Sequence, residues 1–485
     1  MSAPTDPINV LHVINGEHCA ASDGRTFEDR APDDDRLYAA AAHGSVADID
    51  KAVDAAATAF PTCAGSLARE REAWLLAAAD RLEREADDFI NILVDEVGSP
   101  INKARFEVQF ATSYLRAAAG AARRVTGQTI PSDVPGRLSF SVRRPLGVVG
   151  CITPFNVPLI KGVKLSAVPL ATGNTVVLLP SEEAPALAVR LARLYLEAGV
   201  PPGAFNVVTG FGHEIGDALT THPRVRLVNF TGSSRVGRHI AGLCGQHMKR
   251  VTLELGGKNP LLVLADADLD AAVNGAVMSM FLYQGQVCMA ASRIYVEDAV
   301  FDDFTARFVA AAGGLAMGDL RDPQTMIGPI ISNRQRERVR AHIEDAIAKG
   351  ARVLTGGQWH GNRCEPTILC DVTPAMICHA EETFGPVTAV YRVADAREAL
   401  ARANESEFGL SASVYTRSLE HAIETAGGIR AGMVHVNAPS LHDEPQVPFG
   451  GLGMSGFGRE GTEVDIDNTT EWQWLTIQTG ASTHD

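Results

Sequence analysis

The stretch GVVGCITPFNVPLIKGVKLSAVPLATGNTVVLLP, residues 147–180, decides the fold class of this chain. Its two ends, GVVGCIT and TVVLLP, are short apolar runs of the kind that form strands buried on both faces of a sheet. The segment between them, residues 157–172, has the pattern of a helix. A strand, a helix and a second strand joined by short links predict a parallel sheet that helices cover on both faces.

Strand-like and helical patterns continue to alternate along the rest of the chain. Residues 45–90 are predicted to be helical, and residues 129–152 are rich in β-branched residues and turn signals, which predicts strands. The last predicted strand, residues 472–478, is distant in sequence from its domain, so we expect that it can pair with another chain. The fold class predicted is α/β with two doubly wound, Rossmann-like domains, of which the first suits a dinucleotide.

Composition excludes several kinds of protein. The 485-residue chain has a formal net charge of −15, which argues against a nucleic-acid or anionic-membrane surface. It has no run of 18 apolar residues and begins without the pattern of a secretory signal, so we expect no membrane span and no export. Eight cysteines show neither C-x-x-C pairs nor zinc-finger spacing, so we expect no metal. Free thiols fit a reducing cytoplasm, where one can act as a reagent.

One of these thiols has unusual surroundings. Cys288 lies in YQGQVCMAASRIYV, after Gly285 and among small residues. A lone cysteine is usually an inert buried side chain. Gly285, however, allows the backbone to approach a ligand closely, and a thiolate adds readily to a carbonyl carbon. Cys288 is therefore the candidate nucleophile.

Two other side chains fit the same chemistry. Glu254 in VTLELGGKNP ends an apolar strand and precedes two glycines; it is either a solvated surface group or a partly buried carboxylate that activates water. Asn156 in GCITPFNVPLI is either a turn residue or an amide that donates to an oxyanion. The tetrahedral adduct of a thiol and an aldehyde carries such an oxyanion.

Two features point to a dinucleotide. The turn FTGSSRVGR, residues 230–238, follows a strand and opens a helix, where backbone N–H groups can bind pyrophosphate. It is not G-x-G-x-x-G, and an ordinary glycine turn has the same sequence pattern. Glu182 comes just after the strand TVVLLP, a position from which a carboxylate accepts from ribose hydroxyls and repels a 2′-phosphate.

The motifs of this chain resemble those of the aldehyde dehydrogenase superfamily. Seven of them occur in family order: ITPFNVP, GNTVVLLPSE, FTGSSRVG, LELGGKNP, GQVC, EETFGPV and PFGGLGMSGFGRE. The resemblance runs from INGEH near residue 14 to the last predicted strand. It implies NAD-dependent oxidation of an aldehyde to the carboxylic acid, through a thiohemiacetal and a thioester that water hydrolyses.

The resemblance assigns roles to the matched residues. Cys288 is expected to be the nucleophile and Glu254 the general base for deacylation. Asn156 and the backbone N–H of Cys288 are expected to form the oxyanion hole. The matched positions with a more structural role are Lys258, Arg293 and Asn437.

The cofactor residues follow the family pattern with one exception. Those expected to contact the pyrophosphate, ribose and nicotinamide are Thr153, Pro154, Phe155, Glu182, Gly232, Ser233, Val236, Leu255, Glu382 and Phe384. Leu179 stands where a lysine usually hydrogen-bonds the adenosine ribose, so one contact worth about 0.5–1.5 kcal/mol is missing. Because Glu182 is retained and no cation is expected to meet a 2′-phosphate, the sequence predicts NAD as the cofactor, with NADP less favoured.

The substrate is expected to be an aromatic or hydrophobic aldehyde. HDEPQVPFGG, FLYQGQVCM and SAVPLATGN are similar to the family branch that oxidises salicylaldehyde, benzaldehyde and vanillin. The residues expected to line the aldehyde tunnel are Tyr283, Val287, Met289 and Phe449, with Leu282 and Asp443 as further candidates. Apolar and aromatic walls suit a ring, while a medium-chain aliphatic aldehyde or a semialdehyde is the alternative.

Two other kinds of protein share part of this pattern. A non-catalytic protein that kept the fold need not retain the nucleophile, the base and the oxyanion donor together. A thiol hydrolase without a cofactor has no use for the pyrophosphate turn or the ribose-binding carboxylates. The complete set of residues therefore favours the dehydrogenase.

The resemblance also implies how the chain is divided. Residues 1–122 and 146–255 are expected to form the NAD-binding domain, and residues 256–452 the catalytic domain. Residues 123–145 and 465–485 are expected to form an oligomerisation element, in a homodimer or a homotetramer. The expected ligands are small molecules.

Overall fold

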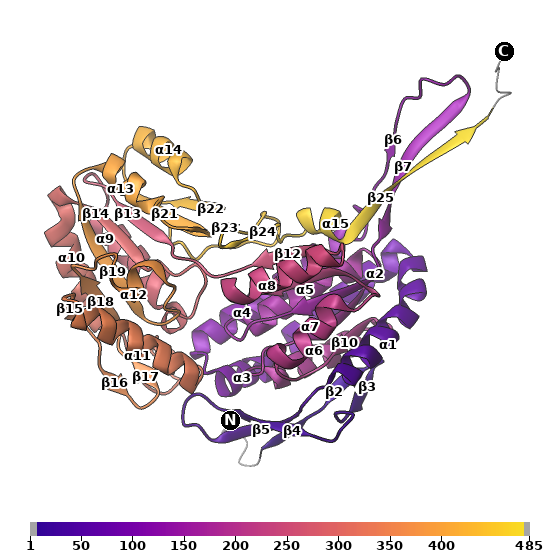
Figure 1. The fold of residues 1–485 in the computed structure, drawn as a ribbon, viewed down its shortest axis with the longest axis horizontal. Coiled ribbons are helices and arrows are strands. Elements are labelled where there is room, and N and C mark those ends of the chain that lie inside the picture. Colours follow the sequence, from indigo (N-terminus) through magenta and orange to yellow (C-terminus); the bar gives the residue numbers. More distant parts are fainter. Residues whose placement is uncertain (1–6, 480–485) are drawn as a thin grey trace.

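The computed structural model describes residues 7–479, so the predictions for residues 1–6 and 480–485 lie outside it. Two large sheets covered by helices lie beside each other, and a narrow β arm projects from the side of the first (Figure 1). The predicted α/β class with two doubly wound sheets is confirmed. No helix within residues 7–479 has both the length and the apolar character needed to cross a membrane.

The first sheet has the strand order β24-β12-β11-β8-β9-β10-β2-β3. Its strands are β2 (His12–Ile14), β3 (Glu17–Cys19), β8 (Val148–Ile152), β9 (Thr175–Leu179), β10 (Phe205–Val207), β11 (Val225–Thr231), β12 (Arg250–Glu254) and β24 (Gly456–Phe457). The five strands β8 to β12 run parallel. Since β8 lies between β9 and β11, successive connections leave it in opposite directions, and the crevice at such a switch point is where dinucleotides bind.

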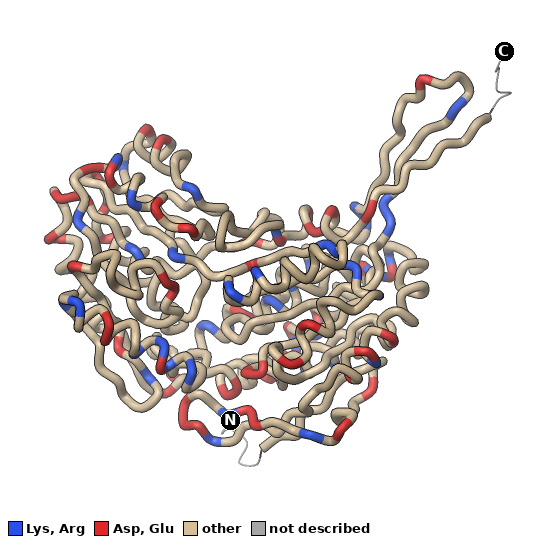
Figure 2. The backbone as a smooth tube through the Cα atoms, in the orientation of Figure 1, with Lys and Arg blue, Asp and Glu red and all other residues tan. Residues whose placement is uncertain are grey.

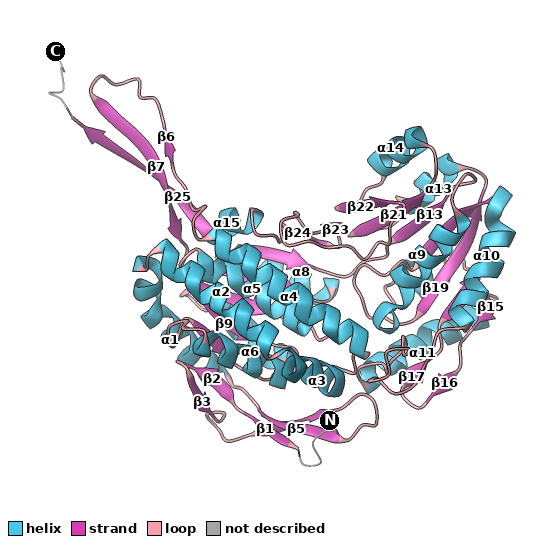
Figure 3. Ribbon diagram, turned by 180° about the vertical axis from the view of Figure 1, so that it is seen from behind, coloured by secondary structure: helices cyan, strands magenta, loops and turns pink. Residues whose placement is uncertain are grey.

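Strand β9 shows why helices cover both faces of this sheet. Val176 and Leu178 pack on one face and Val177 and Leu179 on the other, because side chains alternate along a strand. The first face is covered by α2 (Ala68–Arg84), α3 (Ala86–Val97), α4 (Ile101–Ala121), α5 (Pro158–Ala171) and α6 (Pro185–Glu197), which are in front in Figure 3. The second is covered by α1 (Val46–Gly65), α7 (Gly212–Thr221) and α8 (Ser234–Gln246).

The second sheet has the order β15-β18-β19-β14-β13-β21-β22, and all but β15 run parallel. Its strands are β13 (Pro260–Val263), β14 (Arg293–Glu297), β15 (Arg352–Thr355), β18 (Thr367–Cys370), β19 (Val387–Val393), β21 (Ser411–Tyr415) and β22 (Met433–Val436). Its helices are α9 (Leu269–Phe281) and α10 (Asp298–Gly313) on one face, and α11 (Asn333–Ala348), α12 (Ile377–Ala380), α13 (Ala396–Ala403) and α14 (Leu419–Gly428) on the other.

The structure adds two local details to the predictions. Residues 45–90 are helical as predicted, but they belong to three helices: Ser66 and Leu67 are extended between α1 and α2, and Glu85 separates α2 from α3, which continues to Val97. The N-terminal strands had no counterpart in the prediction. These and the remaining short strands are β1 (Ile8–Val10), β4 (Thr26–Arg30), β5 (Leu37–Ala42), β16 (Trp359–His360), β17 (Arg363–Cys364), β20 (Phe408–Gly409) and β23 (Leu452–Gly453).

The arm joins distant parts of the chain. It consists of β6 (Gln128–Thr129), β7 (Arg137–Pro145) and β25 (Thr470–Gln478), and the short helix α15 (Val464–Thr469) leads into it. β25 pairs antiparallel with β7 along its whole length. The last strand therefore has a partner in its own chain, which the sequence distance did not suggest. Its other edge is unpaired within the described residues, since the order is β25-β7-β6.

Candidate active site

The predicted catalytic residues lie where the two sheets face each other. Glu254 ends β12, and a link of residues 255–259 leads directly to the first residue of β13. The Cys288 turn precedes β14, which pairs parallel with β13. The Asn156 loop follows β8. The carboxyl ends of the first sheet and the amino ends of the second therefore enclose the site, as the parallel topology requires.

A strained turn presents the nucleophile. Tyr283, Gln284 and Gly285 have φ values of 50°, 45° and 70°, a left-handed conformation that is costly for the two side chains. The Gln284 amide stabilises it, because Nε2 donates to the Pro329 carbonyl at 2.7 Å and Oε1 accepts from Gly328 N–H at 3.0 Å. A Cβ at residue 285 would collide with the Gly385 carbonyl, so the close approach predicted for this glycine is to protein backbone.

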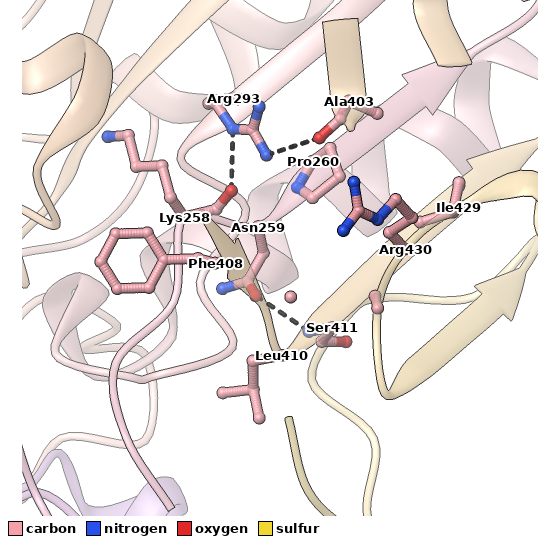
Figure 4. A pocket seen from close by; sticks show the side chains of 12 residues that line it. Lys258, Asn259, Pro260, Arg293, Ala403, Phe408, Leu410, Ser411, Ile429 and Arg430 are labelled. Atoms are coloured by element: carbon pink, nitrogen blue, oxygen red, sulfur yellow. Dashed lines mark hydrogen bonds between the residues drawn. The ribbon is translucent and has the colours of Figure 1, made fainter. Parts of the chain in front are cut away.

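The peptide that follows the nucleophile is also held. Asn259 Nδ2 donates to the Cys288 carbonyl at 2.8 Å and to the Ala290 carbonyl at 3.0 Å, and its Oδ1 accepts from Ser411 N–H at 3.0 Å (Figure 4). At Gly257 a Cβ would lie 2.6 Å from the Cys288 carbonyl oxygen, so only glycine fits. The link between the sheets is therefore part of the support of Cys288.

The Cys288 thiol is held in its neutral form. Burial raises its pKa to about 12, while Lys161 opposes this change and Glu382, Glu254 and Glu460 add to it. A thiol in these surroundings needs a base or a change in local charge before it can attack.

Glu254 is more deeply buried than predicted. Its exposure is 2%, and among the described residues neither carboxylate oxygen has a hydrogen-bond partner. Burial raises its pKa well above the usual range and Glu460 adds to the effect, whereas Lys161 and Lys164 oppose it. A Cβ at Gly450 would lie 2.6 Å from Glu254 Oε1, so this glycine provides the space that the carboxylate occupies.

A cluster of buried charges lies beside this carboxylate, and of its members only Asp443 was expected near the site. Lys161 Nζ is 2.6 Å from Glu460 Oε2, and Lys164 Nζ is 2.7 Å from Asp443 Oδ2 and 3.5 Å from Glu460. Although burial opposes it, the two lysines hold the pKa of Glu460 below its usual range. The signal was available: two lysines three residues apart lie on one face of an otherwise apolar helix.

Asn156 is held through its main chain. Its exposure is 4%, and its carbonyl accepts from Lys103 Nζ at 2.7 Å. This contact does not use the side-chain amide, a group that can donate to a substrate oxygen.

The residues expected to hold a dinucleotide are brought together at the switch point. Ser233 caps the 13-residue helix α8, and its Oγ accepts from Val236 N–H at 3.4 Å. Gly232 N–H donates to the Glu254 carbonyl at 3.0 Å. A Cβ at Gly237 would collide with Leu255, so α8 lies directly against the loop that follows β12. This helix N-terminus fits a pyrophosphate.

The residues expected to contact the nicotinamide and its ribose lie on two loops. The Phe155 and Phe384 rings are 5.8 Å apart and nearly perpendicular. Glu382 Oε1 accepts from Gly257 N–H at 2.9 Å, and burial raises the pKa of this carboxyl to about 7. Thr153 N–H donates to the Leu179 carbonyl, which continues the ladder between β8 and β9 beyond the end of β8, so Pro154 follows directly at the mouth of the crevice. A nicotinamide bound here would accept the hydride.

Comparison with known proteins decides the family. The model of the aldehyde dehydrogenase family matches residues 19–475. The chain belongs to this family. A vanillin dehydrogenase of Pseudomonas fluorescens is 42% identical over 98% of each chain, and a glutarate-semialdehyde dehydrogenase of Pseudomonas putida is 37% identical over 96% of this chain and 97% of the relative. A solved salicylaldehyde dehydrogenase from Pseudomonas putida G7, complexed with salicylaldehyde, has a TM-score of 0.95 and 38% identity, covering 98% of this chain and 99% of that one.

The predicted family and enzyme class are thereby confirmed. As an aldehyde dehydrogenase, the chain oxidises aldehydes, and its cofactor is NAD or NADP. Among the described residues, no group of three or more His, Cys, Asp or Glu side chains is arranged to hold a metal ion.

One contact of this aldehyde dehydrogenase differs from the sequence predictions. Arg334 Nη2 lies 3.9 Å from Glu182 Oε1, so a cation does stand near the carboxylate expected to select against a 2′-phosphate. It comes from α11 of the other sheet, which the local sequence could not reveal. Leu179 is fully buried, so an apolar core position replaces the polar contact expected of a lysine there.

The expected tunnel residues have different surroundings. Val287 and Met289 flank Cys288 and are half-buried, and the Phe449 ring packs against Lys164 Nζ at 4.2 Å. Tyr283 is fully buried, and its hydroxyl donates to the Val97 carbonyl at 2.7 Å. These contacts favour a packing role for Tyr283 over the tunnel-wall role that the resemblance implies.

The positions expected to be structural make the corresponding contacts. Arg293 donates from Nε to the Lys258 carbonyl at 2.8 Å and from Nη2 to the Ala403 carbonyl at 3.1 Å (Figure 4). Asn437 binds both the N–H and the carbonyl of Thr416 through its side chain.

Proposed function

We propose that this chain is an NAD-dependent dehydrogenase of uncharged aromatic aldehydes, in which water hydrolyses the thioester. The observation that carries the proposal is Glu254: a fully buried carboxyl without a hydrogen-bond partner among the described residues, within electrostatic reach of Cys288. A group of this kind can take a proton from the water that hydrolyses the thioester. A protein that kept only the fold gains nothing from leaving such a group unpaired.

The first half-reaction forms the thioester. Cys288 gives up its proton to solvent water and its sulfur bonds to the aldehyde carbon, while the electron pair of the C=O π bond moves to the carbonyl oxygen, which becomes an oxyanion. The Asn156 amide and the Cys288 N–H donate to that oxygen. When bound, the nicotinamide supplies the acceptor for the hydride that leaves the same carbon. The adduct thereby becomes the Cys288 thioester.

The second half-reaction releases the acid. Glu254 takes a proton from water, the hydroxyl adds to the thioester carbon, and the carbon–sulfur bond breaks. The departing sulfur is a thiolate, for which Lys161 is the stabilising charge. Glu254 must be ionised to act, so its raised pKa limits this step at low pH.

Glu254→Gln should separate the two half-reactions. Glutamine keeps the shape but cannot accept the proton, so one equivalent of NADH should form and turnover should then fall by roughly 10²–10⁴-fold. Rapid-mixing absorbance measures both phases. In the unchanged enzyme the steady rate should rise with pH through a pKa well above that of an ordinary carboxyl, and the variant should lose that dependence. Unchanged steady turnover in the variant would remove Glu254 from this role.

Charge near the site favours a neutral substrate. Lys161 and Lys164 already pair with Glu460 and Asp443, so neither needs a substrate carboxylate. Asp443 Oδ1 is buried without a hydrogen-bond partner among residues 7–479 and would repel one. The similarity to vanillin and salicylaldehyde dehydrogenases supports an aromatic ring. The similarity to a glutarate-semialdehyde dehydrogenase, together with the two lysines, keeps a semialdehyde as the second candidate.

A substrate series tests this choice. We expect kcat/KM for benzaldehyde, salicylaldehyde and vanillin to exceed that for succinic semialdehyde by roughly tenfold or more, since one buried charge mismatch costs over 1 kcal/mol. NADH formation is the readout, and hexanal is included to compare an aliphatic aldehyde with the aromatic ones. A preference for the semialdehyde would contradict the proposal. The Asp443→Asn substitution should raise activity on succinic semialdehyde above that of the unchanged enzyme, because it removes the repulsion between Asp443 and the substrate carboxylate.

The cofactor proposed is NAD. Glu182 repels a 2′-phosphate, while the side chain of Arg334 is 83% exposed, so solvent screens its charge. We expect higher kcat/KM for NAD than for NADP at limiting cofactor, and Arg334→Ala should widen the ratio by removing this cation. Higher kcat/KM for NADP in the unchanged enzyme would show that Arg334 outweighs Glu182.

In the proposed division of the chain, residues 1–122 and 146–255 form the NAD-binding domain and residues 256–452 form the catalytic domain. The arm, with residues 123–145 and 465–485, is proposed as an oligomerisation element that joins two or four copies of the chain. The outer part of the arm carries few charges (Figure 2). Several of its large apolar side chains are exposed: Ile130, Val134, Leu138, Trp472, Trp474 and Ile477. Light scattering should show a dimer or tetramer that the Trp474→Glu substitution dissociates. The control substitution Leu419→Glu, at a similarly exposed apolar residue on α14, should leave the oligomer intact.

The proposed cellular setting is the cytoplasm, which the eight free cysteines suit.

A further inference from the structure

Helix α4 carries a buried ammonium group beside the Asn156 loop. Lys103 is 5% exposed, and its Nζ donates to Glu107 Oε2 at 2.5 Å, to the Asn156 carbonyl at 2.7 Å and to Ser99 Oγ at 3.1 Å. A protonated lysine has three N–H donors, so these partners use all of them. The group is therefore fixed in direction as well as in place.

Its counter-ion holds the next part of the same loop. Glu107 is fully buried, and its Oε1 accepts from the backbone N–H groups of Leu159 at 2.9 Å and Ile160 at 3.3 Å. These belong to the first turn of α5, whose N–H groups have no partner inside the helix. Asn156 thus stands between two anchors on α4, one on its own carbonyl and one on the helix that begins two residues later.

The same ammonium group contacts the nucleophile turn. Lys103 Nζ lies 4.2 Å from the centre of the Tyr283 ring, a cation–π contact between buried groups. The Tyr283 carbonyl accepts from Gln286 N–H at 3.0 Å, two residues before the nucleophile. Lys103 therefore touches the oxyanion-donor loop of the first sheet and the turn that leads to Cys288.

Stability alone does not account for an ion pair in this position. Removing two charges from water is costly, and apolar residues of similar volume in place of a buried pair are often as stable or more stable. What an apolar pair cannot do is direct hydrogen bonds to a particular carbonyl and to two particular N–H groups.

We propose that the Lys103–Glu107 ion pair positions the oxyanion donor: it holds the Asn156 loop at a set distance from the nucleophile turn. The proposal rests on the role given to Asn156 under the proposed function. Neither residue of the pair contacts the reacting atoms, so both act through Asn156. Removing the pair should slow thioester formation and leave cofactor binding unchanged.

A double-mutant cycle tests this coupling. The rate of the first NADH turnover with benzaldehyde at saturating NAD is measured for the unchanged enzyme, Asn156→Ala, the pair variant Lys103→Met/Glu107→Gln, and the combination. The pair variant removes both charges together, so none is left buried alone. It also keeps a side-chain carbonyl for the N–H groups of α5.

The expected pattern is specific. Asn156→Ala should slow the first turnover by roughly 10²–10³-fold, as loss of an oxyanion donor does. The pair variant should slow it roughly tenfold or more, with less than about a twofold change in the Kd for NAD. In the Asn156→Ala background the same pair change should cost no more than about twofold, because coupled residues are not additive.

Arg71→Met is the matched control. Arg71 is another buried cation that donates to a carbonyl of α5, that of Ala171 at 2.8 Å, but at the opposite end of the helix. Its loss should lower Tm and leave the first-turnover rate unchanged. A purely structural role for Lys103 would give the same result as this control.

Other outcomes overturn the proposal. Effects of Asn156→Ala and the pair variant that multiply would show that the pair acts independently of Asn156, and a first turnover unchanged in the pair variant would show that it does not act at all. If Asn156→Ala leaves the first-turnover rate unchanged, the oxyanion role of Asn156 is wrong and this inference fails with it. That result differs from the two preceding outcomes. If the pair variant does not fold, Lys103→Arg, which keeps the charge but moves the donors, must show the same loss and the same coupling.

Discussion

The active site depends on one close backbone approach. The link from Glu254 to Pro260 passes so near the Cys288 peptide that a side chain at Gly257 would meet its carbonyl, and one at Gly256 would meet the Glu382 carboxylate. Asn259 then bonds that same Cys288 carbonyl. The proposed general base, the support of Cys288 and the carboxylate expected to bind the ribose are therefore held together by a few residues, and any widening of the link would separate them.

Around this link the protein arranges charge so that two neighbouring buried carboxyl groups, Glu254 and Glu460, have pKa values shifted in opposite directions. Lys161 and Lys164 are each close to Glu460, which takes up their charge and remains ionised. Glu254 is left with neither a cation of its own nor a hydrogen-bond donor among the described residues, so burial dominates its pKa. Two buried carboxyl groups with opposite shifts give one fixed charge and one proton acceptor, a division of roles that surface carboxylates cannot show.

Most of the helices and strands, and the candidate catalytic residues, could be predicted from local sequence patterns. The alternating core of β9 and the lengths of α5 and α6 follow from residue pattern, and Cys288, Glu254 and Asn156 each stand at the end of a recognisable element. Local pattern did not show that α1 and α2 pack on opposite faces of one sheet, because that depends on the packing of separate elements.

By itself the sequence determined the α/β class, the order of strands and helices along the chain, and the family, since each depends on short-range pattern or on motif identity. Only the tertiary structure decided which groups meet: Lys103 with Asn156 and Tyr283, Arg334 with Glu182, β25 with β7. These contacts join residues from about 50 to over 300 positions apart. Charge and burial at such points come from the packing of separate elements, which no local pattern encodes.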